Sequence, residues 1–258
     1  MAYEDILFIK DDGVARITIN RPQAYNAFRT HTLKEMVSAL EDAELDRDIR
    51  VIVLRGAGDK AFCTGGDVQE SKDGGYDQDM DYWHGRVHHM IREVTKPVIA
   101  AVNGFAIGGG HILHVICDLT IASSTAKFGQ SGPKVGSFDA GYGAAYLARI
   151  VGEKKAREIW FLCRTYTAEQ ALAMGLVNKV VEPDQLDKEV QAWCDEIKDL
   201  GAYALRFLKH SFNADTDHIT GFENMSMAAV RQYWSTDEAM AQKSKFKARQ
   251  KAKKEGKR

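Results

Sequence analysis

Two glycine-rich turns are the segments of this sequence best suited to bind an oxyanion. The first, residues 62–67, contains Gly65 and Gly66, and the second, residues 103–111, holds three consecutive glycines before His111. Glycine lets the backbone approach a ligand closely, and N–H groups at a helix start lack intrahelical partners. Two such donors directed at one oxygen would form an oxyanion hole. The alternative is that the glycines serve only tight turns and close packing, since neither turn has a dinucleotide or phosphate-loop motif.

Five histidines have spacings that could bind a metal or line a pocket. His84, His88 and His89 share a predicted helix, and His111 and His114 form an H-x-x-H pair. The zincin pattern H-E-x-x-H is absent, and no clear third ligand lies near the H-x-x-H pair. We therefore predict no metal site. We expect His111 and His114 to be packed or capping residues, and the other group to line a substrate pocket.

The composition is that of a globular protein with a basic end. The chain has 258 residues, 45% of them hydrophobic and 28% charged, enough for one large domain or two small ones. Residues 243–258 hold nine Lys or Arg against one Glu, a net charge of +8, which leaves −9 for the rest. Only Phe246 accompanies these basic residues, so we do not expect a nucleic-acid partner.

Membrane and secretory signals are not evident in the sequence. The most apolar stretch, residues 97–122, is interrupted by polar residues and glycines, and residues 1–12 have no basic segment followed by an apolar one. The four cysteines lie tens of residues apart, unlike a zinc ligand set or the framework of a small secreted domain. We therefore expect a cytoplasmic protein without a membrane partner.

The apolar patterns predict an α/β core followed by helices. They indicate a hairpin over residues 6–9 and 14–19, a helix over 32–46, and buried strands over 51–54 and 98–102. Strands that alternate with helices are typical of an α/β domain. Beyond residue 150 the pattern is helical, over residues 153–163, 168–174, 186–200, 202–212 and about 221–247.

Four motifs in this order resemble those of the crotonase, or enoyl-CoA hydratase/isomerase, superfamily, namely residues 20–28, 61–67, 104–110 and 117–118. The resemblance spans nearly the whole chain. It implies a spiral of ββα units over residues 1–200 and a helical C-terminal extension over 201–258 that contributes to trimerisation and to the CoA site. It also implies a homotrimer or homohexamer and an acyl-CoA substrate whose thioester oxygen binds the N–H groups of Gly66 and Gly109. No permanently bound cofactor is expected.

The acid and base of hydratases in this superfamily do not match this chain. Their two glutamates correspond to Ile112 and Gly132 here. We therefore do not expect simple hydration of an enoyl-CoA.

Residues 128–143, together with 155–160 and 211–216, resemble one branch of the superfamily. This branch contains 1,4-dihydroxy-2-naphthoyl-CoA synthase, which closes a ring by intramolecular Claisen condensation, and 2-ketocyclohexanecarboxyl-CoA hydrolase, which opens a β-oxo ring with water. The match implies that Asp139, Ser137 and Tyr76 are catalytic. A carboxylate in an apolar pocket is a credible base. The alternative for Asp139 is a helix N-cap.

The same resemblance assigns the remaining site residues. A bicarbonate ion, held in many naphthoate synthases where a base carboxylate would lie, would bind Gln130, Ser131, Gly132 and Trp160. Residues expected to contact the substrate or CoA, with the two basic ones near the CoA phosphates, are Ala27, Thr64, Gly65, Asp67, Gly132, Trp234, Lys247 and Arg249.

Three positions favour ring opening over ring closure. Trp234, Tyr25 and Val68 replace a tyrosine, an arginine and a glutamine of the synthase pattern. An indole can donate a hydrogen bond but cannot transfer a proton as a phenol can. We predict hydrolytic ring opening of a β-oxo alicyclic carboxyl-CoA, with ring closure of succinylbenzoyl-CoA as the alternative and a non-catalytic acyl-CoA binding protein as a lesser one.

Overall fold

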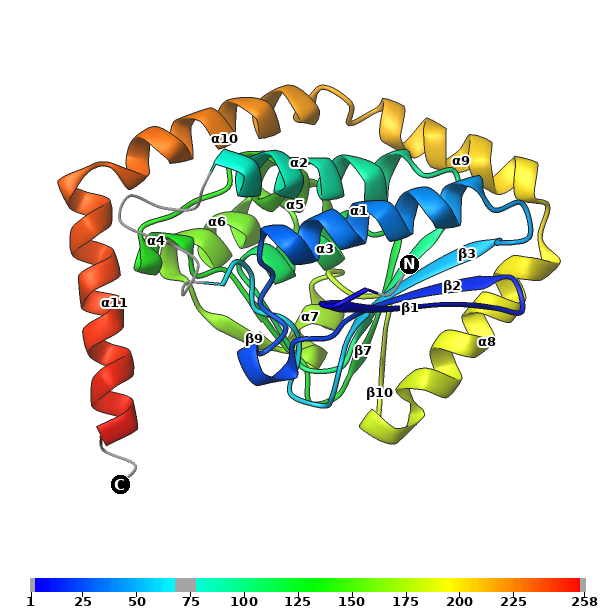
Figure 1. Cartoon of the computed structure of the whole chain (residues 1–258), viewed down its shortest axis with the longest axis horizontal. Coiled ribbons are helices and arrows are strands. Elements are labelled where there is room, and N and C mark those ends of the chain that lie inside the picture. Colours follow the sequence, from blue (N-terminus) through cyan, green and yellow to red (C-terminus); the bar gives the residue numbers. More distant parts are fainter. Residues whose placement is uncertain (1–2, 68–77, 256–258) are drawn as a thin grey trace.

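The computed structural model describes residues 3–67 and 78–255, in which two β-sheets are surrounded by helices (Figure 1). The larger sheet has the order β1-β2-β3-β5-β7-β10, with only the β1–β2 pair antiparallel. Its strands are β1 (Ile6–Asp11), β2 (Val14–Ile19), β3 (Val51–Gly56), β5 (Val98–Val102), β7 (Leu119–Ser123) and β10 (Lys179–Val181). The predicted hairpin is confirmed, and Asp12 and Gly13 at its turn both have positive φ, as a tight two-residue turn requires.

In the second sheet, as in the first, neighbouring strands follow one another in the order of the sequence. It has the order β4-β6-β8-β9, with β8 and β9 antiparallel. Its strands are β4 (Ala61–Cys63), β6 (Phe105–Ile107), β8 (Lys127–Gly129) and β9 (Thr165–Thr167). A strand of the first sheet, a strand of the second and then a helix recur three times, which is the predicted spiral of ββα units.

Helices follow these strand pairs and cover them. In the first part of the chain they are α1 (Thr30–Leu45), α2 (Gln78–Glu93), α3 (Gly109–Ile116), α4 (Gly132–Val135), α5 (Leu147–Val151), α6 (Glu153–Leu162) and α7 (Ala168–Ala173). A π-helix, η2 (Gly141–Tyr146), precedes α5, and the short 3₁₀ turns are η1 (Pro22–Ala24) and η3 (Pro183–Gln185). The last four helices are α8 (Leu186–Asp199), α9 (Ala202–Ala214), α10 (Ile219–Trp234) and α11 (Asp237–Glu255).

The core lies on both faces of the larger sheet. In β5, Val98, Ala100 and Val102 pack into the main cluster, while Ile99 and Ala101 pack against residues of α8 on the other face. Strands buried on both faces read as continuous apolar runs, which explains why this strand was predictable from sequence.

The last predicted helical region is helical in the structure, with a break that the prediction did not include. The region expected to be helical over residues 221–247 is two helices, α10 and α11, separated at Ser235 and Thr236. Thr236 Oγ1 accepts the N–H of Ala239 at 3.3 Å, so a side-chain cap begins a new helix here. The chain turns at this point, and α11 runs down one edge of the molecule while α10 crosses over α2 (Figure 1).

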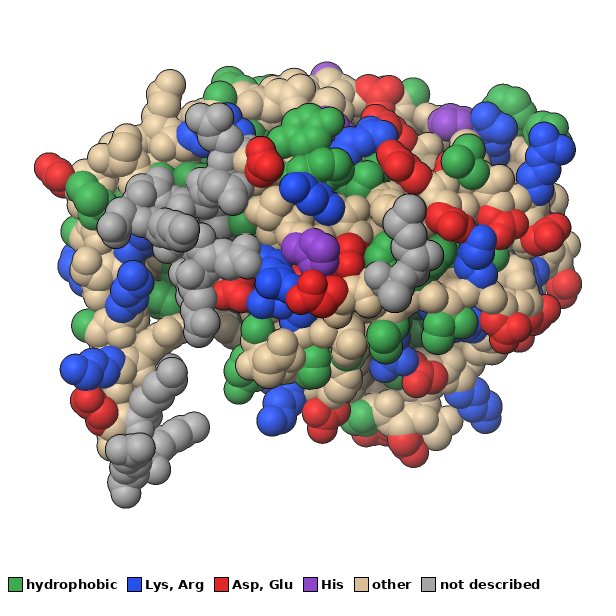
Figure 2. All heavy atoms as spheres, viewed as in Figure 1, with side chains coloured by type: hydrophobic (Ala, Val, Ile, Leu, Met, Phe, Trp, Pro, Cys, Tyr) green, Lys and Arg blue, Asp and Glu red, His purple; other side chains and the backbone are tan. Residues whose placement is uncertain are grey.

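The surface mixes charges of both signs, and several basic side chains project from α11 (Figure 2). In the described part of the chain, no helix combines the length and apolarity needed to cross a membrane.

Candidate active site

The predicted N–H donors of the oxyanion hole lie on adjoining segments. Gly65 O accepts the N–H of Phe28 at 2.9 Å, and the N–H of Asp67 donates to Phe28 O at 2.8 Å. Because a trans peptide directs its C=O and N–H to opposite sides, the N–H of Gly66 points away from Phe28. Gly109 is the first residue of α3, so its N–H has no intrahelical acceptor. A Cβ atom on Gly65 would lie 2.9 Å from the nitrogen of Gly109, which shows how closely the segments approach.

Turn geometry and close packing also require these glycines. Gly65 and Gly108 have φ of +87° and +58°, which side chains other than glycine rarely adopt. A Cβ on Gly110 would lie 1.9 Å from the carbonyl oxygen of Cys63, and one on Gly109 would meet the ring of Phe28 at 2.7 Å. The structural interpretation of the glycines is therefore confirmed, and it does not compete with the functional one.

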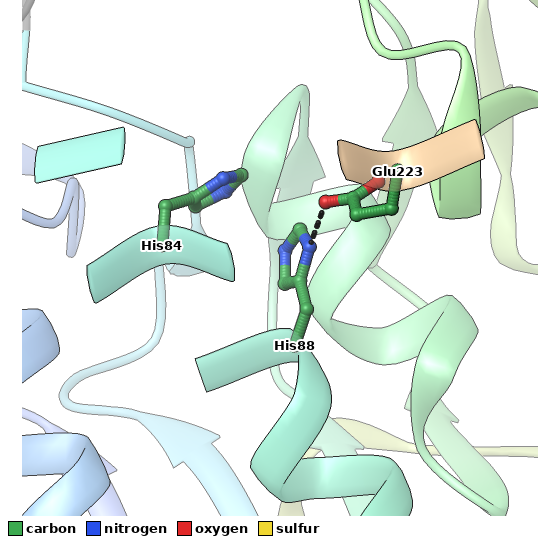
Figure 3. A group of neighbouring side chains, drawn as sticks. All are labelled: His84, His88 and Glu223. Carbon is green, nitrogen blue, oxygen red and sulfur yellow. Dashed lines mark hydrogen bonds and ion pairs between the residues drawn. The ribbon is translucent and has the colours of Figure 1, made fainter. Parts of the chain in front are cut away.

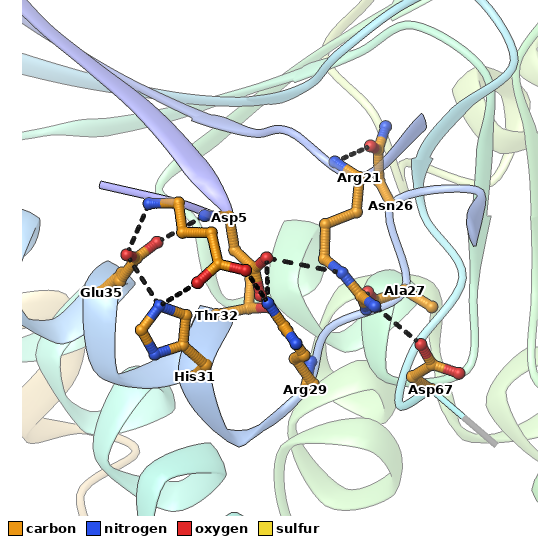
Figure 4. Close-up of polar contacts among 10 residues, drawn as sticks. Asp5, Arg21, Asn26, Ala27, Arg29, His31, Thr32, Glu35 and Asp67 are labelled. Atoms are coloured by element: carbon orange, nitrogen blue, oxygen red, sulfur yellow. Dashed lines mark hydrogen bonds and ion pairs between the residues drawn. The ribbon is translucent and has the colours of Figure 1, made fainter. Parts of the chain in front are cut away.

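Arg21 fixes the segment that carries Gly66 (Figure 4). Its guanidinium lies 2.9 Å from Asp67 Oδ2 and 3.7 Å from Asp5 Oδ1, and it donates to Ala27 O at 2.5 Å. Asn26 accepts the N–H of Arg21 at 3.0 Å. The N-R-P and N-A-F motifs therefore hold in place the loop that carries Gly66, a predicted donor of the oxyanion hole.

A cavity of about 570 Å³ brings most of the predicted site residues together. Those on its wall are Thr64, Gly65, Gly66, Gly109, Gln130, Ser131, Gly132, Ser137, Asp139, Trp160, Trp234 and Lys247. Ile112 and Gly132, which replace the hydratase glutamates, also line it, as do the apolar side chains of Phe28, Met80, Met227 and Val230. The wall is therefore suited to an apolar acyl group next to few polar ones.

Three of the predicted site residues that the structure describes are not on this wall. Ala27 and Asp67 contact Arg21 instead, and Arg249 is exposed on α11. Among the described residues that line the cavity none of these three appears. Tyr76 lies outside the described residues.

Asp139 both caps a helix and lines the cavity, so the cap does not exclude the predicted catalytic role. The carboxylate accepts the N–H of Gly143, in the first turn of η2, at 2.8 Å, and the residue is only 7% exposed. Burial raises the pKa of Asp139 toward neutral pH, and the negative charge of Glu223 raises it further. A carboxyl that titrates near neutral pH suits general acid–base work.

Glu223, on α10, is a fully buried carboxylate that the sequence analysis missed. Its Oε1 lies 2.8 Å from Nδ1 of His88, and its Oε2 accepts the N–H of Tyr142 at 3.2 Å. Burial alone would raise the pKa of Glu223, but the hydrogen bonds to His88 and to the N–H of Tyr142 outweigh burial and lower it. One signal was available, because Glu223 occupies the same helical face as the buried Ile219 and Val230.

One cluster has the residue types of a metal site: it consists of His84, His88 and Glu223 (Figure 3). One nitrogen or oxygen of each lies within 4.8 Å of the others. However, the ring centroids of His84 and His88 are only 4.1 Å apart. Two imidazoles bound to one tetrahedral zinc ion through bonds of about 2 Å have ring centroids about 5 Å apart. As arranged, the cluster fits a hydrogen-bonded group better than an ion.

His111 and His114 are packed in the core, as predicted. Both are fully buried, and burial lowers the pKa of His111 to about 3 and that of His114 well below its usual range. His111 Nδ1 lies 3.2 Å from Gln130 Nε2, and the ring of His114 packs edge-on against Phe128. His84 lines the cavity, so the expectation that one residue of its group does so is confirmed.

The residues predicted to hold bicarbonate are engaged with the protein. The indole N–H of Trp160 donates to the carbonyl of Gly143, and the amide of Gln130 contacts His111. A Cβ on Gly132 would lie 2.7 Å from the carbonyl oxygen of Ser137, so packing alone requires glycine there. Bicarbonate binding stays a prediction.

The outer wall of the cavity comes from α11. Lys243, Phe246 and Lys247 line it, and the ammonium of Lys243 lies 5.8 Å from the ring centroid of Trp234. Burial, with the charge of Lys247, lowers the pKa of Lys243. Two lysines on one wall give this side of the cavity an affinity for anions.

Comparison with known proteins agrees with this geometry. A family model described as enoyl-CoA hydratase/isomerase matches residues 10–255. An enoyl-CoA hydratase from Mycobacterium avium subsp. paratuberculosis K-10 superposes with a TM-score of 0.84 at 26% identity, over 96% of this chain and 97% of that one. An enoyl-CoA hydratase/isomerase from Xanthobacter autotrophicus Py2 gives a TM-score of 0.84 at 31% identity, over 93% and 91%. With the predicted crotonase-like fold thus confirmed, the chain belongs to the enoyl-CoA hydratase/isomerase family of the crotonase superfamily.

Proposed function

We propose that this protein hydrolytically opens the ring of a β-oxo alicyclic carboxyl-CoA. The observation that carries the proposal is that buried Asp139 shares one cavity with Gly66 and Gly109. Ile112 and Gly132 occupy the positions of the hydratase glutamates, and Asp81, which also lines the wall, is ion-paired with Arg231, so we assign the acid–base role to Asp139.

The reaction balances with one water and no other reagent. The Asp139 carboxylate accepts a proton from water as the water oxygen bonds to the ring ketone carbon, and the π electron pair of the ketone moves to its oxygen. This alkoxide then re-forms the C=O bond as the bond from the same carbon to the α-carbon breaks, and the electron pair of that bond enters a thioester enolate whose oxygen accepts the N–H groups of Gly66 and Gly109. Removing one such donor costs about 2.7–4 kcal/mol in other enzymes. The proton on Asp139 passes to the α-carbon, giving an open-chain acid that keeps its thioester.

The nucleotide part of CoA would lie against α11. Lys243 and Lys247 line that side of the cavity, and phosphates pair well with ammonium groups. Ser137 and Thr64, on the inner wall, would hold the acyl group in place.

Ring closure of succinylbenzoyl-CoA is the second candidate, because the same hole and carboxylate serve both directions of the chemistry. Two observations favour opening. Trp234 lies on the wall and offers no transferable phenol proton. The N–H of Trp160, which would help to hold the bicarbonate ion of a synthase, instead donates to the carbonyl of Gly143. A non-catalytic acyl-CoA binding protein would need no carboxylate in the position of Asp139.

Mass spectrometry of product separates these candidates. The purified protein would be incubated with 2-ketocyclohexanecarboxyl-CoA and, separately, with succinylbenzoyl-CoA. Gain of one water supports opening, and loss of one water supports closure. Asp139→Asn should abolish turnover while CoA-thioester binding persists; full turnover by this variant would contradict both mechanisms, and binding of both thioesters without turnover would support the non-catalytic candidate.

We further propose a homotrimer or homohexamer in the cytoplasm. Tyr203, Phe207 and Phe212 on α9 are at least two-thirds exposed, and such apolar surfaces are typical of interfaces. All four cysteines are free and buried, as suits a reducing compartment. Light scattering would give the mass, and Phe207→Asp should lower it.

A further inference from the structure

Two carboxylates meet at the start of η2. The consecutive N–H groups of Tyr142 and Gly143 donate to Glu223 and Asp139, at 3.2 and 2.8 Å respectively. A Cβ on Gly141 would lie 2.2 Å from Glu223 Oε2, so only a glycine lets this carboxylate approach. Both side chains are held by the backbone of one short helix, which fixes them close to each other.

The charge of the pair is held on Glu223. Its side chain and that of His88 are wholly buried, and His88 Nδ1 provides a hydrogen bond at 2.8 Å. The ring centroids of His84 and His88 lie 4.1 Å apart (Figure 3). His84 also lines the cavity. Two adjacent carboxylates in a low-dielectric site do not both ionise, and the better-bonded one keeps the charge.

We propose that Glu223 is a positioning residue that makes Asp139 a stronger base, so that Asp139 takes the proton of the attacking water and holds it until the enolate carbon accepts it. This inference rests on the function proposed above. Glu223 acts through Asp139 and does not itself touch substrate. His88 belongs to the device because its bond keeps the negative charge on Glu223 rather than on Asp139.

The other charged and titratable groups around Asp139 do not replace Glu223. On α2, Asp81 pairs with Arg231 of α10, and the pKa of His84 is lowered to about 3 by burial, so its imidazole is neutral. Other described groups that face the cavity or pack beside η2 are His88 and His89 on α2, His111 on α3, Lys243 and Lys247 on α11, and Arg92 over the ring of Tyr142. Glu223 is the anionic group that acts most strongly on Asp139.

Glu223→Gln tests the proposal, because glutamine has the same shape and can still accept the N–H of Tyr142. Removing the like charge lowers the pKa of Asp139, so Asp139 ionises at lower pH. We expect the acid limb of the kcat–pH profile to move down by about one unit or more. We also expect kcat near neutral pH to fall about tenfold, as a weaker base predicts, with little change in KM. Glu35→Gln is the matched control, since Glu35 is also buried and accepts two backbone N–H groups far from the cavity.

A measurement without substrate keeps this test separate from that of the function. The infrared band of the protonated carboxyl should be present in the wild type near neutral pH and lost in Asp139→Asn. Its midpoint should fall in Glu223→Gln and stay in place in Glu35→Gln. An unshifted midpoint in Glu223→Gln would overturn the inference, even if ring opening is observed. A shifted midpoint would support it even if the substrate proves to be another thioester.

Discussion

Arg21 Nη2 lies 2.9 Å from Asp67 Oδ2, and this contact ties the N-R-P loop to the residue that follows Gly66. Asp5 lies on the other side of the guanidinium. The proposed oxyanion hole therefore depends on a buried ion pair that touches no substrate in the proposed reaction.

Arg21→Ala should destabilise the protein and weaken catalysis together. It breaks the buried ion pair with Asp67, a type of change that costs about 3–5 kcal/mol of unfolding free energy, whereas Asp5 keeps its bonds to Arg29. Urea unfolding measures this loss, and kcat reports the displaced Gly66. Arg149→Ala, which breaks an exposed ion pair with Asp215, should cost less than about 1 kcal/mol and spare kcat. Equal losses of unfolding free energy and of kcat in the two variants would contradict the role of Arg21 in holding Gly66 in place.

Gly109→Ala should lower kcat far more than stability. The new methyl would meet the ring of Phe28 at 2.7 Å, and either the ring or the start of α3 must shift. Displacing one donor of the hole should reduce kcat about 100-fold or more. Gly201→Ala is the control, because its Cβ meets only Ala204 at 3.8 Å, and it should leave steady-state kinetics unchanged.

Acid should destabilise the fold through His111 and His114, which burial keeps neutral. The pKa of His111 is about 3 when folded and 6.5 in the unfolded chain, and that of His114 is lowered too. The unfolded state therefore binds more protons below pH 6.5, so their contribution is present above that pH and is lost as pH falls toward 3. Each histidine should contribute a slope of up to about 1.4 kcal/mol per pH unit. Urea unfolding between pH 8 and 5 should show a flatter slope for His111→Leu than for the wild type, whereas exposed His210→Asn should not differ.

Lys247→Gln should raise KM for a CoA thioester and weaken its dependence on salt, with kcat nearly unchanged. Lys247 lines the cavity wall, where it would face a phosphate, while Arg249 on the same helix does not line it. Arg249→Gln is therefore the matched comparison and should leave KM near the wild-type value. A larger effect from Arg249 than from Lys247 would mean that α11 presents another face to CoA.

The sequence predicted the parts of the site that local chemistry determines. Gly66, Gly109 and Asp139 lie in short motifs that carry the resemblance, and their own segments indicate a turn, a helix start and a cap. The partnership of His88 and Glu223 spans 135 residues and arises only when α10 packs on α2. Asp67 was expected to contact substrate because of the resemblance; its position beside Arg21 depends on tertiary packing.

Synthesis order follows from the placement of α10 and α11. The ribosome releases both N–H donors and Asp139 long before Glu223, Trp234 and Lys247. A nascent chain can therefore form the glycine turns while the cavity still lacks its charged partner and its outer wall. The cavity that the proposed reaction uses is therefore complete only when α10 and α11 have packed against the earlier part of the chain.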